Sequence, residues 1–146
     1  MLNLRVFSEA AWQRRGVCGA ALELNSGDTG DCISLTGVPF GRKMSISMWA
    51  QVHDDAAEER GQVINCNGNR QAVLIEALHG KWVGRVWQFS HDPRSLTVTA
   101  PFTPAEWTHL VLVYDDSQAP LRQLILYVNG VPSYTTQSPT SIWVCN

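Results

Sequence analysis

The acidic and histidine side chains are the first candidates for catalysis, and their spacing does not suit it. Hydrolysis of a glycosidic bond requires two carboxyl groups about 5–10 Å apart. Glu76 stands alone in an apolar segment, and Glu58-Glu59 lie in a charged stretch. His109 lies between Trp107 and Val111 on one face of an expected strand, where the spacing implies neither a nucleophile nor an orienting carboxylate. We therefore expect no enzymatic activity and a structural role for His109.

An aromatic and polar strand is the best candidate for binding a sugar. Carbohydrate sites set an aromatic ring against the apolar face of a pyranose and add polar groups that fix its orientation. Alternate side chains of a strand share a face, so Arg85 lies with Trp87, and Trp82 lies with Gln88. One of these faces should point outward, with Gly84 allowing close backbone approach. The candidate ligand residues are Trp82, Arg85, Trp87 and Gln88, and the alternative is that both tryptophans are covered.

Aspartates in turns are the candidate metal ligands. Asp28 and Asp31 bracket a tight Gly-rich turn, and Asp115-Asp116 end a strand at a loop. Calcium takes several oxygen ligands from carboxylates and loop carbonyls, so either pair could begin such a site. The alternative is an ordinary turn aspartate that accepts a hydrogen bond from its own backbone, and the sequence favours this reading.

The four cysteines, Cys18, Cys32, Cys66 and Cys145, do not suit a structural zinc site, because no C-x-x-C pair is present. They permit three disulfide pairings if they are oxidised. Free thiols are the favoured interpretation, with Cys18 on a strand face beside Ala20 and Leu22, where a small apolar side chain fits.

The composition favours one domain built around a substantial core. The chain has 146 residues, of which 45% are hydrophobic and 16% charged. A formal net charge of −2 gives no field that would attract nucleic acid or an anionic membrane, so neither is an expected partner. No apolar run approaches membrane-spanning length. Residues 1–5 lack a basic start before an apolar stretch, which indicates a cytosolic protein or one whose leader or upstream domain is outside this sequence.

Alternating apolar residues and regularly spaced turns predict an all-β domain. A short helix is expected at 9–15, with Ser8 as its cap and Gly16 at its end. The segment 31–35 is expected to pair with 17–24. The expected strands are 2–7, 17–24, 31–35, 44–52, 62–66, 71–78, 81–90, 95–99, 107–114, 121–128, 131–136 and 142–145.

Two of these segments predict how the layers are packed. In 44–52, methionine, isoleucine, alanine and valine share one face, which predicts a strand with one face in the core. In 107–114 both faces are apolar, so we expect either that both are covered or that the strand lies in a sheet pressed against another layer. Asn129-Gly130 supplies the positive φ angles of a type I′ turn and predicts a hairpin.

Several segments, in this order and spacing, resemble the laminin-G-like jelly-roll domains of the concanavalin A-like lectin/glucanase superfamily. The motifs W-T-H-L-V-L-V-Y-D and L-x-L-Y-V-N-G are typical of that family. The resembling segments are 19–24, 30–33, 45–49, 61–64, 107–115 and 124–130. The resemblance implies an antiparallel two-sheet β-sandwich spanning residues 1–146 as a single domain. Glycosidases of this fold carry E-x-D-x-x-E on one strand, and no such run is present.

The resemblance also implies a function and partners. It points to a non-catalytic module that binds a carbohydrate or glycoconjugate, with calcium assisting through Asp31, which matches the family's G-D-Y-V aspartate. The alternative is a protein-interaction or scaffolding domain of a larger protein, with no sugar site. The segment 2–10 resembles the family's closing strand and its short helix. We expect residues 1–16 to fill that position within one molecule or by exchange between two, and an open sheet edge would otherwise invite a homodimer.

Overall fold

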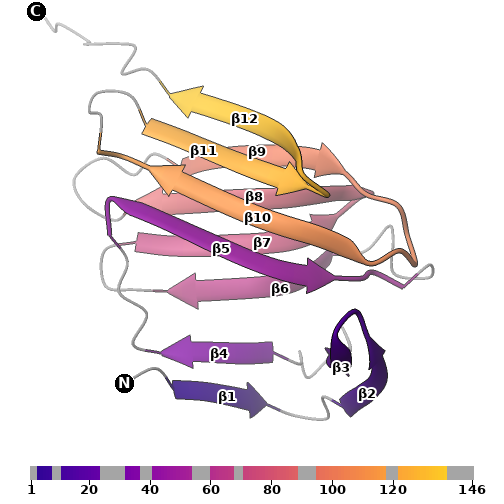
Figure 1. The fold of residues 1–146 in the computed structure, drawn as a ribbon. Helices are drawn as coiled ribbons and strands as arrows, with labels where there is room; N and C mark the ends of the chain where they lie inside the picture. Colours follow the sequence, from indigo (N-terminus) through magenta and orange to yellow (C-terminus); the bar gives the residue numbers. More distant parts are fainter. Residues whose placement is uncertain are drawn as a thin grey trace, which may run out of the picture.

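The structure is a computed structural model. In the part of the chain that it describes, the fold consists of β-strands. The described residues are 3–7, 11–23, 32–36, 41–53, 60–67, 71–88, 95–117 and 122–137. Eight strands form two four-stranded antiparallel sheets, which face each other as two layers (Figure 1). The all-β prediction and the two-sheet sandwich are therefore confirmed. Among the described residues no helix is long and apolar enough to cross a membrane.

We call one layer the front sheet and the other the back sheet. The front sheet has the order β12-β11-β10-β5. Its strands are β5 (Lys43–Ala50), β10 (Thr108–Asp115), β11 (Arg122–Val128) and β12 (Val131–Gln137). The back sheet has the order β6-β7-β8-β9. Its strands are β6 (Arg60–Asn67), β7 (Gln71–Leu78), β8 (Lys81–Gln88) and β9 (Ser95–Pro101). At one side of the sandwich, β9 contacts β11 and β12.

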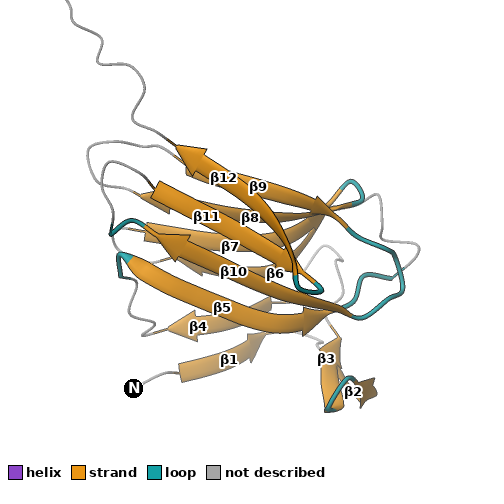
Figure 2. Cartoon of the chain, turned by 45° about the horizontal axis from the view of Figure 1, so that its top comes forward, coloured by secondary structure: helices purple, strands orange, loops and turns teal. Residues whose placement is uncertain are grey.

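The N-terminal part forms two further strand pairs. β1 (Asn3–Phe7) pairs with β4 (Cys32–Thr36), which contacts β6, so this pair extends the back layer (Figure 1). β2 (Ala11–Gly16) and β3 (Gly19–Glu23) form a hairpin below the end of β5 (Figure 2). That residues 1–16 take the position of the family's closing strand stays a prediction.

Two expectations for this N-terminal part are wrong. Residues 11–15 lie in β2 and not in a helix, and β3 pairs with β2 and not with β4. A helix of two turns is marginal on its own, because nucleation is costly. The Val17-Cys18 turn, followed by Gly19 at a φ of 109°, instead lets a hairpin satisfy the backbone groups of both strands. The expected strand 142–145 lies outside the described residues.

The core lies between the inner faces of the two sheets. On β5, Met44, Ile46 and Met48 point inward and their neighbours are exposed, which confirms the predicted one-sided strand. Leu110, Leu112, Leu124 and Leu126 of β10 and β11 are at most 1% exposed. The hairpin turn is also confirmed, with φ of 50° at Asn129 and 81° at Gly130. The β7–β8 turn has the same signs of φ, at His79 and Gly80.

Candidate functional site

The outward side of the back sheet carries a set of polar and aromatic side chains, which we call the back-sheet face. Strand alternation and the pairing register place these side chains together, on the side away from the front sheet. They come from all four strands. The polar and aromatic residues of the back-sheet face are Gln62, Asn65, Glu76, Arg85, Trp87 and Thr97. Ala72, Leu74 and Val83 share this face and are at most 4% exposed.

Arg85 and Trp87 lie at the centre of this face. The guanidinium carbon of Arg85 is 5.4 Å from the centroid of the Trp87 ring. The Arg85 Nε–H donates a hydrogen bond to Thr97 Oγ1 at 3.2 Å. The nearest Glu76 oxygen is 4.0 Å from an Arg85 terminal nitrogen, and Glu76 itself is 1% exposed. Because guanidinium has five N–H donors, several of those on Arg85 have no partner among the described residues.

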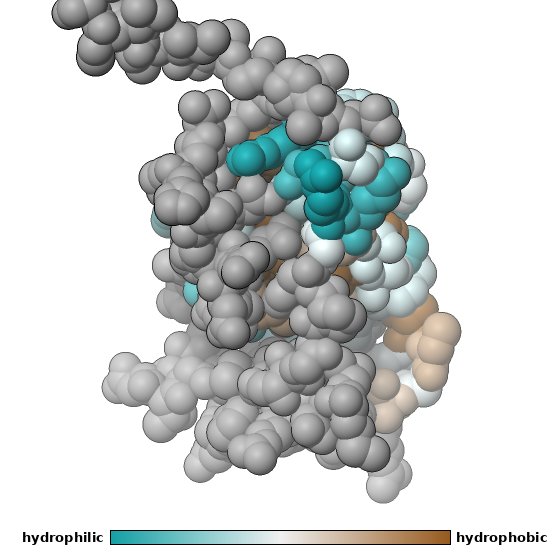
Figure 3. Space-filling view, turned by 90° about the vertical axis from the view of Figure 1, so that its left-hand side faces the viewer, coloured by the Kyte–Doolittle hydropathy of each residue, from teal (hydrophilic) through white to brown (hydrophobic). Residues whose placement is uncertain are grey.

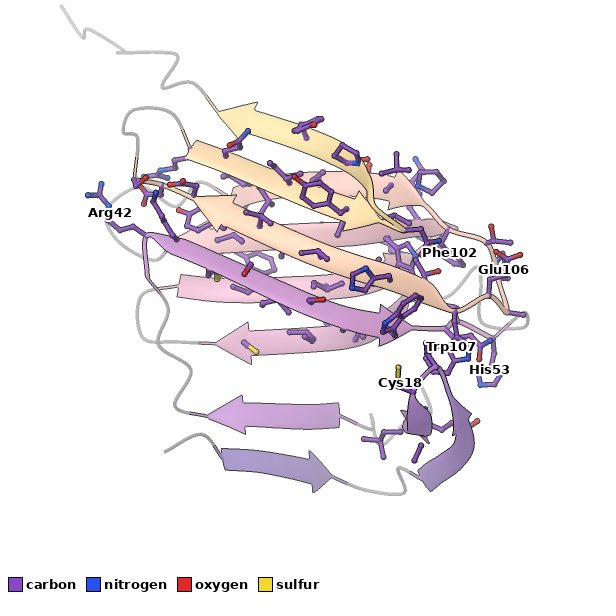
Figure 4. The ribbon with its side chains drawn as sticks, viewed as in Figure 1. Cys18, Arg42, His53, Phe102, Glu106 and Trp107 are labelled. Carbon is purple, nitrogen blue, oxygen red and sulfur yellow. The ribbon has the colours of Figure 1, made fainter. Side chains whose placement is uncertain are left out.

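Trp82 and Gly84 lie on the opposite side of β8, in the core. Trp82 is 1% exposed, and its ring centroid is 5.3 Å from that of Phe102, which follows β9 (Figure 4). Its indole N–H has no hydrogen-bond partner among the described residues. A Cβ on Gly84 would meet Leu112 of the front sheet at 2.6 Å, so the glycine serves contact between sheets and not the approach of a ligand.

Of the four predicted ligand residues, the structure therefore brings two together. Arg85 and Trp87 share the outward face, and Trp82 is removed from the candidate site because it is a core residue. The backbone of Gln88 pairs with that of Gln71, and its side chain lies outside the described part. The sequence showed which residues share a face, and only the packing of two sheets decides which face is covered.

The predicted calcium ligands Asp28 and Asp31 lie outside the described residues. Within the described ranges, no three His, Cys, Asp or Glu side chains form a group that could hold a metal ion. The other aspartate pair is engaged within the protein. Asp115 accepts a hydrogen bond from the Ser117 N–H at 2.7 Å, and the Lys43 ammonium lies 3.4 Å from its carboxylate. Asp115 thus makes the hydrogen bond that is expected of an ordinary turn aspartate.

Asp116 directly follows β10, on the side of the molecule where Figure 3 shows hydrophilic side chains gathered. The Tyr114 hydroxyl donates to Asp116 Oδ2 at 3.3 Å, and Arg42, labelled in Figure 4, lies 3.6 Å from Asp116 Oδ1. Burial of the ring, followed by the nearby Asp116 carboxylate, raises the pKa of Tyr114 to about 12 from 10.0. The neutral phenol is thus the form that the fold stabilises.

Alkaline unfolding tests this placement of Tyr114. The pKa of Tyr114 is higher in the folded chain than in the unfolded chain. The stabilisation of the fold by neutral Tyr114 is therefore complete below pH 10 and is lost as the pH rises from about 10 to about 12. A rise of the Tyr114 pKa from 10.0 to about 12 corresponds to roughly 3 kcal/mol of unfolding free energy. Urea unfolding at pH 9 and pH 11.5 should show a smaller loss for Tyr114→Phe than for the wild type. Equal losses would contradict the placement.

The outward side of the front sheet, which we call the front-sheet face, is a second surface that the sequence prediction missed. Trp49 is 47% exposed and stacks on His109, with ring centroids 4.9 Å apart. His109 Nε2 is also 3.0 Å from the Ser47 hydroxyl. No described element covers this face, and β10 lies in a sheet whose inner face packs against the back sheet, which is the second of the two alternatives expected for this strand. The residues of the front-sheet face are Ser45, Ser47, Trp49, His109, Val111, Val113, Ile125, Tyr127, Pro132 and Tyr134.

Two cysteines can be placed. Cys18 is exposed in the β2–β3 turn and not on an apolar strand face as expected, and Cys66 of β6 is buried. Both are free thiols, which confirms the favoured interpretation for these two. Burial raises the pKa of the Cys66 thiol, so this thiol is held in its unreactive neutral form.

Comparison with known proteins gives one family match. A laminin G family model, described as the concanavalin A-like lectin/glucanases superfamily, matches residues 26–146. No curated protein and no solved structure gives a significant match. The matched range contains both sheets of the sandwich and every residue of the back-sheet face.

Proposed function

Because the chain belongs to the concanavalin A-like lectin and glucanase superfamily, we propose that it is a non-catalytic module that recognises a carbohydrate or glycoconjugate. The observation that carries the proposal is the pairing of Arg85 with Trp87 on the back-sheet face. The Trp87 ring offers an apolar surface for a pyranose. The remaining Arg85 donors and the Asn65 and Gln62 amides offer hydrogen bonds to its hydroxyl groups.

The spacing of carboxylates supports a role without catalysis. The superfamily includes glucanases, whose chemistry requires a pair of carboxyl groups across the scissile bond. Among the described residues of the back-sheet face, Glu76 is the one carboxylate, and it is buried beside Arg85. The chain also lacks the E-x-D-x-x-E run of the glycosidases that share the fold. A single carboxylate cannot supply both the acid that protonates the leaving oxygen and the nucleophile or base on the opposite side of the bond.

Calcium assistance is part of the proposal, and it rests on the sequence. Asp28 and Asp31 bracket a Gly-rich turn in a stretch that the family model covers. Carboxylates with loop carbonyls are the ligands that calcium prefers. The bound ion would offer a positive charge to the hydroxyl groups of the sugar.

A glycan array probed with calcium, and again with a chelator, tests the proposal. Binding to a defined group of glycans is expected, and its loss in chelator would support the role of calcium. Asp31→Asn should then reproduce the effect of the chelator, with Asp115→Asn as the matched variant at an aspartate that is already bonded to Ser117 and Lys43. Silence of the array under both conditions would contradict carbohydrate recognition.

Trp87→Ala should weaken binding to the best glycan by about tenfold or more, because aromatic anchors carry a large share of binding energy. Arg85→Ala should weaken it as well, since the guanidinium is held against Trp87 and Thr97. Trp49→Ala is the matched control, because Trp49 is an exposed tryptophan on the other sheet. Isothermal titration of the three variants measures the difference, and equal weakening by Trp49→Ala would place the site elsewhere.

A protein-interaction domain is the second candidate, and the front-sheet face favours it. Val111, Val113 and Ile125 lie side by side across two strands, and Trp49 and Tyr134 are exposed at the borders. Exposed apolar patches of this kind mark sites of protein contact. Under this alternative, substitutions at Trp49 and Tyr134 would abolish partner binding, and Trp87→Ala would leave it unchanged.

A further inference from the structure

The outer edge of β5 offers a strand-pairing surface. On one side β5 pairs with β10 over eight residues without a bulge, from Lys43 opposite Asp115 to Ala50 opposite Thr108. On the other side no described strand pairs with it, and β5 forms that border of the front sheet (Figure 1). An edge strand carries a row of backbone donors and acceptors ready for another strand.

The direction of the backbone groups on β5 follows from one hydrogen bond. The Asn129 N–H donates to the His109 carbonyl oxygen at 2.8 Å, so His109 directs its backbone toward β11. Backbone direction alternates along an antiparallel strand, so Leu110 bonds Met48 on β5. The residues of β5 that direct N–H and C=O groups to the outer edge are therefore Lys43, Ser45, Ser47 and Trp49.

The opposite border of the front sheet is interrupted by a proline, and the border at β5 is not. By the same alternation, Pro132 of β12 faces outward from its position opposite Tyr127, and proline has no N–H to offer there. β5 contains neither proline nor glycine between Lys43 and Ala50. Its inner-face side chains Met44, Ile46 and Met48 are only half-buried, so they keep apolar surface to cover.

We propose that β5 pairs antiparallel with β5 of a second copy of this chain, with Ile46 opposite the partner's Ile46. This register is the one that matches all four outward residues. Lys43 then lies opposite the partner's Trp49, and Ser45 lies opposite the partner's Ser47. A lysine ammonium over a tryptophan ring is attractive, and the two-fold axis creates this pair twice.

The inner face is matched in the same register. Met44 lies opposite the partner's Met48, so the half-buried side chains of two strands form one continuous apolar row. The two front sheets become one eight-stranded sheet. The partner at the β5 edge is thus a second copy of this chain, because the strand matches itself in the pairing of lysine with tryptophan and in its apolar inner face.

Sedimentation equilibrium on the full chain tests the proposal. The wild type should show a mass of twice the 16.2 kDa monomer at micromolar concentration. Trp49→Lys places two lysines opposite each other and should raise the dimer dissociation constant at least about tenfold. The exchanged variant Lys43→Trp/Trp49→Lys restores a lysine opposite a tryptophan and should restore the dimer.

A proline at the edge supplies the second test. Ser45→Pro removes an N–H that points outward and leaves the bonds to β10 in place, so it should give a monomer; Ser45→Ala should remain a dimer. Circular dichroism and melting temperature check that each variant is folded. A wild type that is monomeric at all concentrations, a dimer that survives Ser45→Pro, or an exchanged variant that stays monomeric would each overturn the proposal. None of these outcomes bears on sugar binding by the back-sheet face.

Discussion

Replacement of Trp82 by alanine should lower the free energy of unfolding by about 3–5 kcal/mol. The side chain is 1% exposed and packs against Phe102 in the core between the sheets. Removing it takes away a large apolar surface and leaves a cavity that close-packed neighbours fill only in part. Urea unfolding followed by far-ultraviolet circular dichroism measures the loss.

Trp82→Phe is the matched variant. The indole N–H of Trp82 has no partner among the described residues, so phenylalanine keeps an aromatic ring and removes an unsatisfied donor. We expect a cost below about 1.5 kcal/mol. If Trp82→Ala costs no more than Trp82→Phe, the side chain is not in the core, and the face of β8 assigned to the interior is wrong.

Gly84→Ala should cost about 1–3 kcal/mol, although alanine is ordinarily the better residue inside a strand. The added Cβ would lie 2.6 Å from Leu112 Cδ1 and 3.2 Å from Val98 Cγ1. Leu112 is 1% exposed and has little room to move. Gly61 of β6 is the matched control, because a Cβ there meets no atom within 4 Å. Gly61→Ala should be neutral or stabilising in the same urea experiment.

A double-mutant cycle separates this contact from a general effect on the strand. Leu112→Ala alone should cost about 2–5 kcal/mol. With Leu112 shortened, the methyl group of Gly84→Ala enters the vacated space, so the two losses should fall short of additive by about 1–2 kcal/mol. Additive losses would show that Gly84 and Leu112 do not touch, and the two sheets would then not meet at this point.

The strands of the front sheet were predictable because the residue patterns that specify them lie within each strand and its turn. The alternation along β5 and the apolar rows of β10 and β11 each indicate a strand by themselves. The Asn129-Gly130 pair specifies both the turn and the register of the hairpin. The family's motifs then identified the sandwich that these strands form.

The N-terminal pairing was not predictable in the same way. A helix at 9–15 was predicted from a capping residue and from charges near its ends. Each of these stabilises a helix by a few tenths of a kcal/mol to about 1 kcal/mol. A strand pairing with β3 outweighs them. The partner of β4 is β1, about thirty residues away in the chain, and no local pattern names a partner at that distance.

The sequence predicted which candidate site residues share a face of β8, but not which of the two faces points outward. Alternation along β8 separates Arg85 and Trp87 from Trp82, and the sequence contains no rule for which group faces the front sheet. The contact of Gly84 with Leu112 decides it, since a residue without a side chain lets the sheets approach. The exposed Trp49 was not predicted as a site residue because it shares its face with Ser45 and Ser47, a pattern equally typical of a solvated face.

The most direct test of recognition through the back-sheet face is the affinity of Trp87→Ala and Trp82→Phe for one glycan selected on the array. Isothermal titration should give wild-type affinity for Trp82→Phe and a loss of about tenfold or more for Trp87→Ala. Retention of full affinity by folded Trp87→Ala would contradict a site on this face.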